Sequence, residues 1–183
     1  FGLVMVGGGQ QLSGGGAKKV TAFSVFIVFL GAFFYFYEYF LRISPSVMKS
    51  EFVSTFHLGA AGFGTLSDFY FYAYTPMQLV VGIFIDRFPI RRTLVIAVLM
   101  CTAGSLLISV SDLFWMAALG RVLQGLGSAF AFVSALKLAA MWLPVSRFAL
   151  VAGSCAALGF LGAGLGEIIL SHAVKVFGWR HSI

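Results

Sequence analysis

Two arginines lie inside long apolar runs of this sequence, and arginine is well suited to gripping an anion. Arg42 follows Glu38 by four residues, which places both side chains on one face of a helix. The two either neutralise each other as an ion pair or bind a solute, with Arg42 offering a planar fork of donors to a carboxylate or phosphate. Both interpretations stay open from the sequence.

The second arginine, Arg121, precedes Gln124 by three residues in a run that begins at Leu113. At about 1.5 Å per helical residue, Arg121 lies about 12 Å from the start of that run. A cation at such a depth in a membrane is costly and normally faces a cavity or a partner. Arg121 and Gln124 are therefore candidate substrate-binding residues.

Asp68 lies about ten residues into another apolar run, near its middle. A carboxylate taken out of water is harder to ionise, so an acid at this depth can bind and release a proton as its surroundings change. Asp68 could equally be a permanent partner of Arg121. The candidates for substrate binding or proton coupling are Glu38, Arg42, Asp68, Arg121 and Gln124.

The elements that must position these side chains are strongly apolar. Of the 183 residues, 60% are hydrophobic and 10% are charged, against roughly 25% charged in an ordinary soluble domain. Five runs approach or exceed the about 20 residues that an α-helix needs to cross a bilayer, and none shows the alternation of a barrel strand. The sequence predicts an all-α membrane protein with spans at about 20–41, 58–85, 93–110, 113–136 and 148–171.

Residues outside the apolar runs indicate organisation and orientation. Residues 1–19 include a Gly, Gln and Ser stretch, so we expect a flexible N-terminal segment ahead of a membrane domain at 20–183. Basic residues favour the side shared by the N-terminus and the 86–92 loop, which predicts a cytoplasmic N-terminus. The net charge of +6 is scattered over short loops, so nucleic acid is not an expected partner. The abrupt ends predict a fragment of a longer protein.

A short loop carries the most specific motif. The sequence reads Gly82-Ile-Phe-Ile-Asp86-Arg87-Phe-Pro-Ile-Arg91-Arg92 and resembles the G-x-x-x-D-R-x-x-x-R-R signature of the major facilitator superfamily. An ordinary basic loop would explain the arginines but not the Gly/Asp spacing. The resemblance implies a conformational latch, in which Gly82 admits a neighbouring helix and Asp86 bonds to groups in the opposite half of a transporter.

Three further motifs extend this resemblance over nearly all of 20–183. Arg121-Val-Leu-Gln124-Gly125 is similar to the family's R-x-x-Q-G pattern, Trp142-Leu-Pro to its W-[FL]-P, and Gly178-Trp-Arg to its G-W-R. The family has two six-helix halves. The chain is therefore expected to supply five helices of the N-terminal bundle, with the C-terminal half as a missing partner. Pro89 stands where the loop signature usually has Gly, and the drug-antiporter motif is absent from 148–171.

The resemblance implies a secondary active transporter of the bacterial inner membrane that works by alternating access, driven by a proton or counter-solute gradient, with proton symport as the expected mode. The aromatic-rich first run, ending in Ser44-Pro45-Ser46, is similar to bacterial carriers related to a lysosomal dipeptide-transporter-like branch. Amino acids, small peptides or organic acids are the cargo this implies. Organophosphate antiporters share the first-helix arginine, but a lysine expected near Gln78 is absent, so sugar phosphate is the alternative.

Other function classes lack the residues they require. A membrane-embedded enzyme would need paired aspartates, an H-E-x-x-H helix or a Ser/His dyad, and an ATP-driven carrier would need a phosphate-binding loop. The sequence contains none of these patterns, and Cys101 and Cys155 have no metal-ligand spacing. We expect neither a catalytic residue, nor a cofactor, nor a metal, and the expected partners are a small-molecule substrate, protons and the lipid bilayer.

Overall fold

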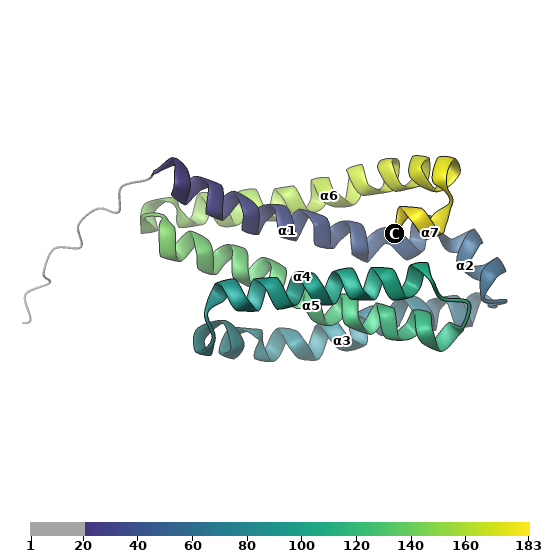
Figure 1. Cartoon of the computed structure of the whole chain (residues 1–183). Coiled ribbons are helices and arrows are strands. Elements are labelled where there is room, and N and C mark those ends of the chain that lie inside the picture. Colours follow the sequence, from purple (N-terminus) through teal and green to yellow (C-terminus); the bar gives the residue numbers. More distant parts are fainter. Residues whose placement is uncertain (1–20) are drawn as a thin grey trace, which may run out of the picture.

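The computed structural model describes residues 21–183, in which the regular elements are helices. The predicted flexible segment at 1–19 lies outside the described residues. Five long helices run side by side in alternating directions (Figure 1), and they are α1 (Ala22–Val47), α3 (Ala60–Arg87), α4 (Ile90–Ser109), α5 (Phe114–Trp142) and α6 (Phe148–Phe177). Short helices α2 (Lys49–Thr55), η1 (Val145–Arg147) and α7 (Trp179–Ser182) connect or follow them. The predicted all-α class is confirmed.

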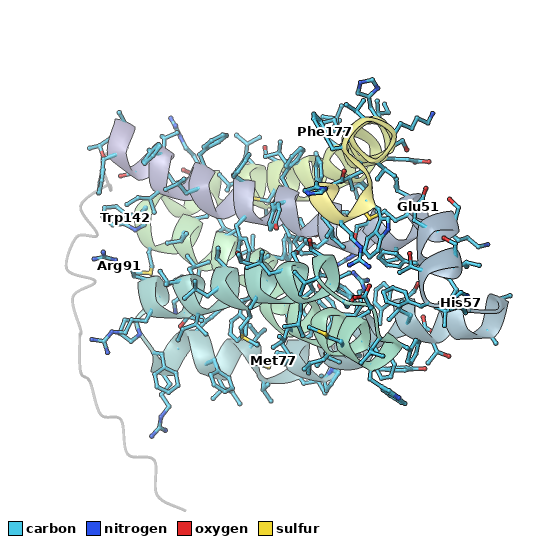
Figure 2. The ribbon with its side chains drawn as sticks, turned by 45° about the vertical axis from the view of Figure 1, so that its right-hand side comes forward. Glu51, His57, Met77, Arg91, Trp142 and Phe177 are labelled. Atoms are coloured by element: carbon cyan, nitrogen blue, oxygen red, sulfur yellow. The ribbon has the colours of Figure 1, made fainter. Side chains whose placement is uncertain are left out.

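The alternating directions give the bundle two distinct ends (Figure 2). The end that carries Arg91 and Trp142, here called the Arg91 end, includes the α3–α4 and α5–α6 connections. The opposite end, here called the His57 end, carries Glu51 and His57. The C-terminal part of α1 and the first turns of α3 and α5 therefore come together toward the His57 end.

Hydropathy separates α3 from the other long helices. Within residues 21–183, four segments are long and apolar enough to cross a membrane, namely α1, α4, α5 and Val145–Phe177. Helix α3 has 28 residues, which is ample length, but it falls outside this set. Asp68, Gln78 and several tyrosines lower its hydropathy. Helix α3, which corresponds to the predicted span at 58–85, is therefore more polar than expected.

The helices also extend beyond the apolar runs. Helix α1 continues to Val47, α5 to Trp142 and α6 to Phe177. Helices α5 and α6 end at residues that interrupt helical backbone, not where hydrophobicity is lost. Pro144 soon follows α5, and Gly178, with a φ of 77°, follows α6.

Helix α5 is the centre of the bundle and packs against α1, α3 and α4. Glycines allow these backbones to approach closely. A Cβ on Gly125 would overlap the backbone oxygen of Tyr70 in α3, and a Cβ on Gly104 of α4 would lie 2.5 Å from the backbone oxygen of Gly120. Close approach through small residues is how helices associate where lipid provides no hydrophobic driving force.

Helix α6 packs on α1 through a similar face. A Cβ on Gly159 would lie 2.5 Å from the ring of Tyr39, and one on Gly162 would lie 2.7 Å from the backbone oxygen of Phe36. Gly166 makes the corresponding contact one turn further on. The aromatic side chains of α1 are therefore seated against glycines of α6, which is a packing role for much of that aromatic surface.

A clamp at the His57 end joins α7 to the rest of the bundle. Arg180 pairs with Asp112 at 2.6 Å and donates to the backbone oxygen of Ser109 at 2.9 Å. The Ser109 hydroxyl donates in turn to the backbone oxygen of Arg180. The neighbouring Trp179 stacks edge-on against Phe52 of α2, with ring centres 5.2 Å apart. The G-W-R motif thus ties the turn after α6 to α2 and to the end of α4.

Candidate functional site

Glu38 and Arg42 form an ion pair within α1. Glu38 is fully buried, and its Oε1 accepts from Arg42 Nε at 3.0 Å and from Nη2 at 2.6 Å. The hydroxyl of Tyr70, on α3, donates to the same oxygen, while Glu38 Oε2 is buried without a hydrogen-bond partner. The guanidinium of Arg42 lies 4.7 Å from the ring centre of Tyr39 and 5.0 Å from that of Tyr74. Arg42 is thus balanced by a carboxylate and held between two rings.

Arg121 is more deeply buried than Arg42 and has a different set of partners. It is 1% exposed, and its Nη1 donates to the backbone oxygen of Leu41 at 2.9 Å and to Gln124 Oε1 at 2.8 Å. Its guanidinium lies 4.7 Å from the ring centre of Tyr70. Its Nε is buried with no hydrogen-bond partner. None of the ion pairs found in residues 21–183 includes Arg121.

The side chain of Gln124 is oriented by α4. Its Nε2 donates to Ser105 Oγ at 2.8 Å, which leaves Oε1 facing Arg121. Gln124 and Ser105 are both buried. The R-x-x-Q spacing makes this contact possible, because residues three apart on a helix are neighbours. The sequence reasoning missed Ser105 and Tyr70, whose only signal was a polar atom on a helical segment.

Glu38, Arg42, Tyr70, Arg121 and Gln124 are here called the arginine cluster. The structure does not bring Asp68 into this cluster. Asp68 is exposed, and neither of Arg121's hydrogen-bond partners is Asp68. Of the two interpretations left open for Asp68, the one that makes it a permanent partner of Arg121 is wrong for this arrangement of helices. Residues two apart on an α-helix point about 200° apart, so the burial of Tyr70 against α5 turns Asp68 outward.

One exposed stripe of α3 carries polar residues at intervals along its length, together with exposed apolar side chains such as Leu79. Asp68, Thr75, Gly82 and Asp86 are exposed, and their spacings of seven, seven and four residues place them along one side of the helix. Nothing lies within 4 Å of a Cβ built on Gly82. An acid facing hydrocarbon would be costly, so this stripe is suited to contact with protein or water rather than with lipid tails.

The predicted latch residues lie at the Arg91 end, and the structure gives Asp86 a partner in the same bundle. Asp86 Oδ1 pairs with Lys137 Nζ of α5 at 2.6 Å. The latch partner expected for Asp86 in the opposite half of a transporter stays a prediction, and within the described residues its partner is Lys137. The other latch arginines, Arg87, Arg91 and Arg92, are exposed.

A hollow of about 680 Å³ lies between α1 and α4 at the Arg91 end. Apolar side chains line it, together with Arg91 and Trp142, which Figure 2 shows at this end. Neither Arg42 nor Arg121 contributes to its wall. The hollow is therefore separate from the arginine cluster.

Comparison with known proteins agrees with this geometry. Residues 20–183 match the family model described as Major Facilitator Superfamily. The chain is 31% identical over 143 residues to the transporter YybO of Bacillus subtilis, covering 78% of this chain and 33% of that protein. It is 23% identical over 148 residues to SauU of Cupriavidus necator, named a probable sulfoacetate transporter, covering 81% of this chain and 34% of that protein.

The chain spans about a third of the length of these two relatives. The family match nonetheless takes in each long helix, from α1 to α6, and the arginine cluster that they enclose. The apolar helices and this match together indicate an integral, multi-pass membrane protein. This chain belongs to the Major Facilitator Superfamily.

Proposed function

We propose that this chain is part of a secondary active transporter that moves a small carboxylate-bearing solute by alternating access. The observation that carries the proposal is the buried charge of Arg121, which no carboxylate of the described residues balances. The cluster contains one negative side chain, Glu38, and two positive ones, Arg42 and Arg121. One anionic group of a substrate would neutralise this cluster.

Amino acids, small peptides and organic acids all carry the carboxylate that such a cluster would bind. The relative named for sulfoacetate supports an organic acid among these. In this proposal Arg121 and Gln124 bind the substrate from α5. Arg42, whose side chain is 24% exposed, adds a second cation from α1 once it leaves Glu38.

Proton coupling is a second part of the proposal, and Glu38 is its first candidate. Glu38 is fully buried, and its Oε2 has no donor, so a proton there would have no competing partner. Protonated Glu38 would also release the two Arg42 donors that it holds. Asp68, on the exposed stripe of α3, is the second candidate for the proton, and symport with protons is the expected mode.

The second half of the transporter would cover the polar stripe of α3 and complete the substrate site. Gly82 is open to an approaching helix, and the exposed pair of Asp86 and Lys137 can be exchanged for contacts with that half as the bundles rock. We propose that the Arg91 end is cytoplasmic, with the N-terminus inside and the protein in the bacterial inner membrane. The excess of basic residues at that end supports this orientation.

A binding screen on the complete transporter tests the substrate class. Organic acids including sulfoacetate, amino acids, dipeptides and sugar phosphates would each be added to the purified protein, and the shift in its melting temperature measured. A ligand at about 100 times its Kd stabilises by about 2.7 kcal/mol, which is readily measured. We expect one carboxylate class to stabilise the protein and its uncharged amide analogue to have no effect.

Stabilisation by sugar phosphates alone would instead support organophosphate antiport. Uptake of the selected carboxylate into proteoliposomes with an imposed pH gradient then tests coupling. We expect accumulation only when the proton gradient is directed inward. Equal uptake with and without the gradient would exclude proton symport.

A further inference from the structure

The backbone of α1 has an unusual feature next to the arginine cluster. Pro45 lies inside the C-terminal part of α1 and is buried. In an α-helix the carbonyl of Leu41 accepts from the N–H of the residue four positions later, but Pro45 has no N–H. Leu41 is 3% exposed, so water does not readily replace the missing donor. An unmet buried carbonyl is costly.

Side chains supply the donors that the helix lacks. The Ser44 hydroxyl donates to the Leu41 oxygen at 2.9 Å from within α1. Arg121 Nη1 donates to the same oxygen, also at 2.9 Å, from α5. A carbonyl has two lone pairs, so both bonds can form together. The carbonyl freed by Pro45 is therefore an anchor point for Arg121 on a neighbouring helix.

This anchor determines which edge of Arg121 remains available. Nη1 donates to both Leu41 and Gln124, which accounts for its two hydrogens. Nε, on the edge of the planar guanidinium that does not include Nη1, is buried and has no partner. A carboxylate binds a guanidinium best through two parallel hydrogen bonds along one edge. With Nη1 held, the edge that contains Nε is the one left for a ligand.

We propose that Pro45 is a positioning residue for substrate binding. By withholding an N–H from the Leu41 carbonyl, Pro45 reserves that carbonyl for Arg121, and this fixes the guanidinium with its Nε edge free for the substrate carboxylate. The proposal rests on the function proposed above, because it takes Arg121 as the residue that binds the substrate anion.

The decisive variant is Pro45→Ala, which restores the N–H that would compete with Arg121 for Leu41. A second variant carries ester-linked lactic acid at position 45, introduced by nonsense suppression. It has the alanine side chain but no N–H, so it separates the loss of the ring from the gain of the donor. Pro76→Ala is the matched control, because Pro76 is also inside a long helix but lies on the exposed side of α3.

The first readout does not depend on transport. In the full chain with ¹⁵N-labelled arginine, a guanidinium held at Nη1 rotates slowly and gives separate Nη1 and Nη2 signals, which Arg121→Lys would identify by their loss. We expect Pro45→Ala to merge the Arg121 signals into an averaged one. The lactic acid variant and Pro76→Ala should keep them separate. Separate Arg121 signals in Pro45→Ala, or merged signals in both position-45 variants, would overturn the proposal.

The second readout is the KM for uptake of the carboxylate selected by the screen, measured with the complete transporter. We expect Pro45→Ala to raise KM about tenfold, the effect of one lost hydrogen bond, with a nearly unchanged maximal rate. The lactic acid variant should restore the KM. An unchanged KM in Pro45→Ala would contradict the positioning role. An unchanged KM in Arg121→Lys would instead contradict the substrate assignment of Arg121, whatever the ¹⁵N signals show.

Discussion

Arg42 and Arg121 lie on neighbouring helices, α1 and α5, yet the protein balances their charges in different ways. Arg42 pairs with the Glu38 carboxylate at 2.6 Å, and its side chain is 24% exposed. Arg121 is 1% exposed and meets only neutral acceptors, the oxygens of Leu41 and Gln124. One arginine is held in a closed ion pair, and the other keeps an unbalanced charge.

The difference indicates separate roles for two residues of the same type. A buried cation met only by dipoles is costly, and its energy falls when an anion arrives. Arg121 therefore gains from a substrate carboxylate without losing an existing ion pair. Arg42 must first leave Glu38, so its engagement depends on the state of that carboxylate. Four predictions test this contrast, from the largest expected effect to the smallest.

Arg121→Ala should reduce uptake by at least about a hundredfold, because it removes the charge and the fork that hold the substrate. Uptake into proteoliposomes by the complete transporter measures this, with membrane insertion checked separately. Arg147→Ala is the control, because Arg147 is exposed in the short helix η1. Normal uptake by Arg121→Ala would show that the unbalanced charge of Arg121 is not used in transport, and the proposed difference between Arg121 and Arg42 would then be wrong.

Arg42→Met should destabilise the bundle by about 3–5 kcal/mol, since it leaves the fully buried Glu38 without a counter-charge. The double variant Glu38→Gln/Arg42→Met should recover most of this loss, because no buried charge remains at the pair. Thermal unfolding in detergent compares the two. If the double variant is no more stable than the single one, the ion pair is not what sets Arg42 apart from Arg121.

Gly125→Ala should cost about 1–3 kcal/mol through overpacking, because its new Cβ would overlap the Tyr70 backbone oxygen. Separation of α3 from α5 would also move the ring that lies against Arg121. Gly64→Ala is the matched control, since a Cβ at Gly64 of α3 meets nothing within 4 Å. Equal stability of the two variants would show that the α3–α5 contact tolerates a larger spacing.

Tyr70→Phe should have the smallest effect, about 1 kcal/mol of stability, through loss of the hydrogen bond to Glu38. The ring that faces Arg121 is retained, so the KM for substrate should stay within about twofold of normal. Unfolding and uptake assays on one preparation separate these two effects. A large rise in KM would indicate that the hydroxyl acts on substrate binding as well as on the ion pair.

Much of this arrangement follows from the sequence by simple rules. Apolar runs predict the long helices, and the spacing of four residues places Glu38 and Arg42 on one face of a helix, where they form an ion pair. Which side of α3 points into the bundle could not be predicted in the same way. It has polar residues around much of its circumference, so hydrophobicity does not decide whether Tyr70 or Asp68 points inward.

The hydrogen bond from Arg121 to the backbone oxygen of Leu41 also could not be predicted from sequence patterns. It depends on the relative height of α1 and α5, which the glycine contacts of the bundle set. The presence of Pro45 in a helical run does predict that the Leu41 carbonyl lacks its backbone donor, but it does not identify the side chain that replaces that donor. Contacts between residues 80 positions apart need the packed structure.

The clamp between Arg180 and the end of α4 has a consequence for how the protein is made. Ser109 and Arg180 are 71 residues apart in the chain. At roughly 5–20 residues per second, a ribosome needs roughly 4–14 s to synthesise that interval. During this time the C-terminal end of α4 lacks its hydrogen bonds to Arg180, while α5 and α6 are being made. The clamp cannot close until Arg180 has been synthesised, so it forms after α5 and α6 have been made.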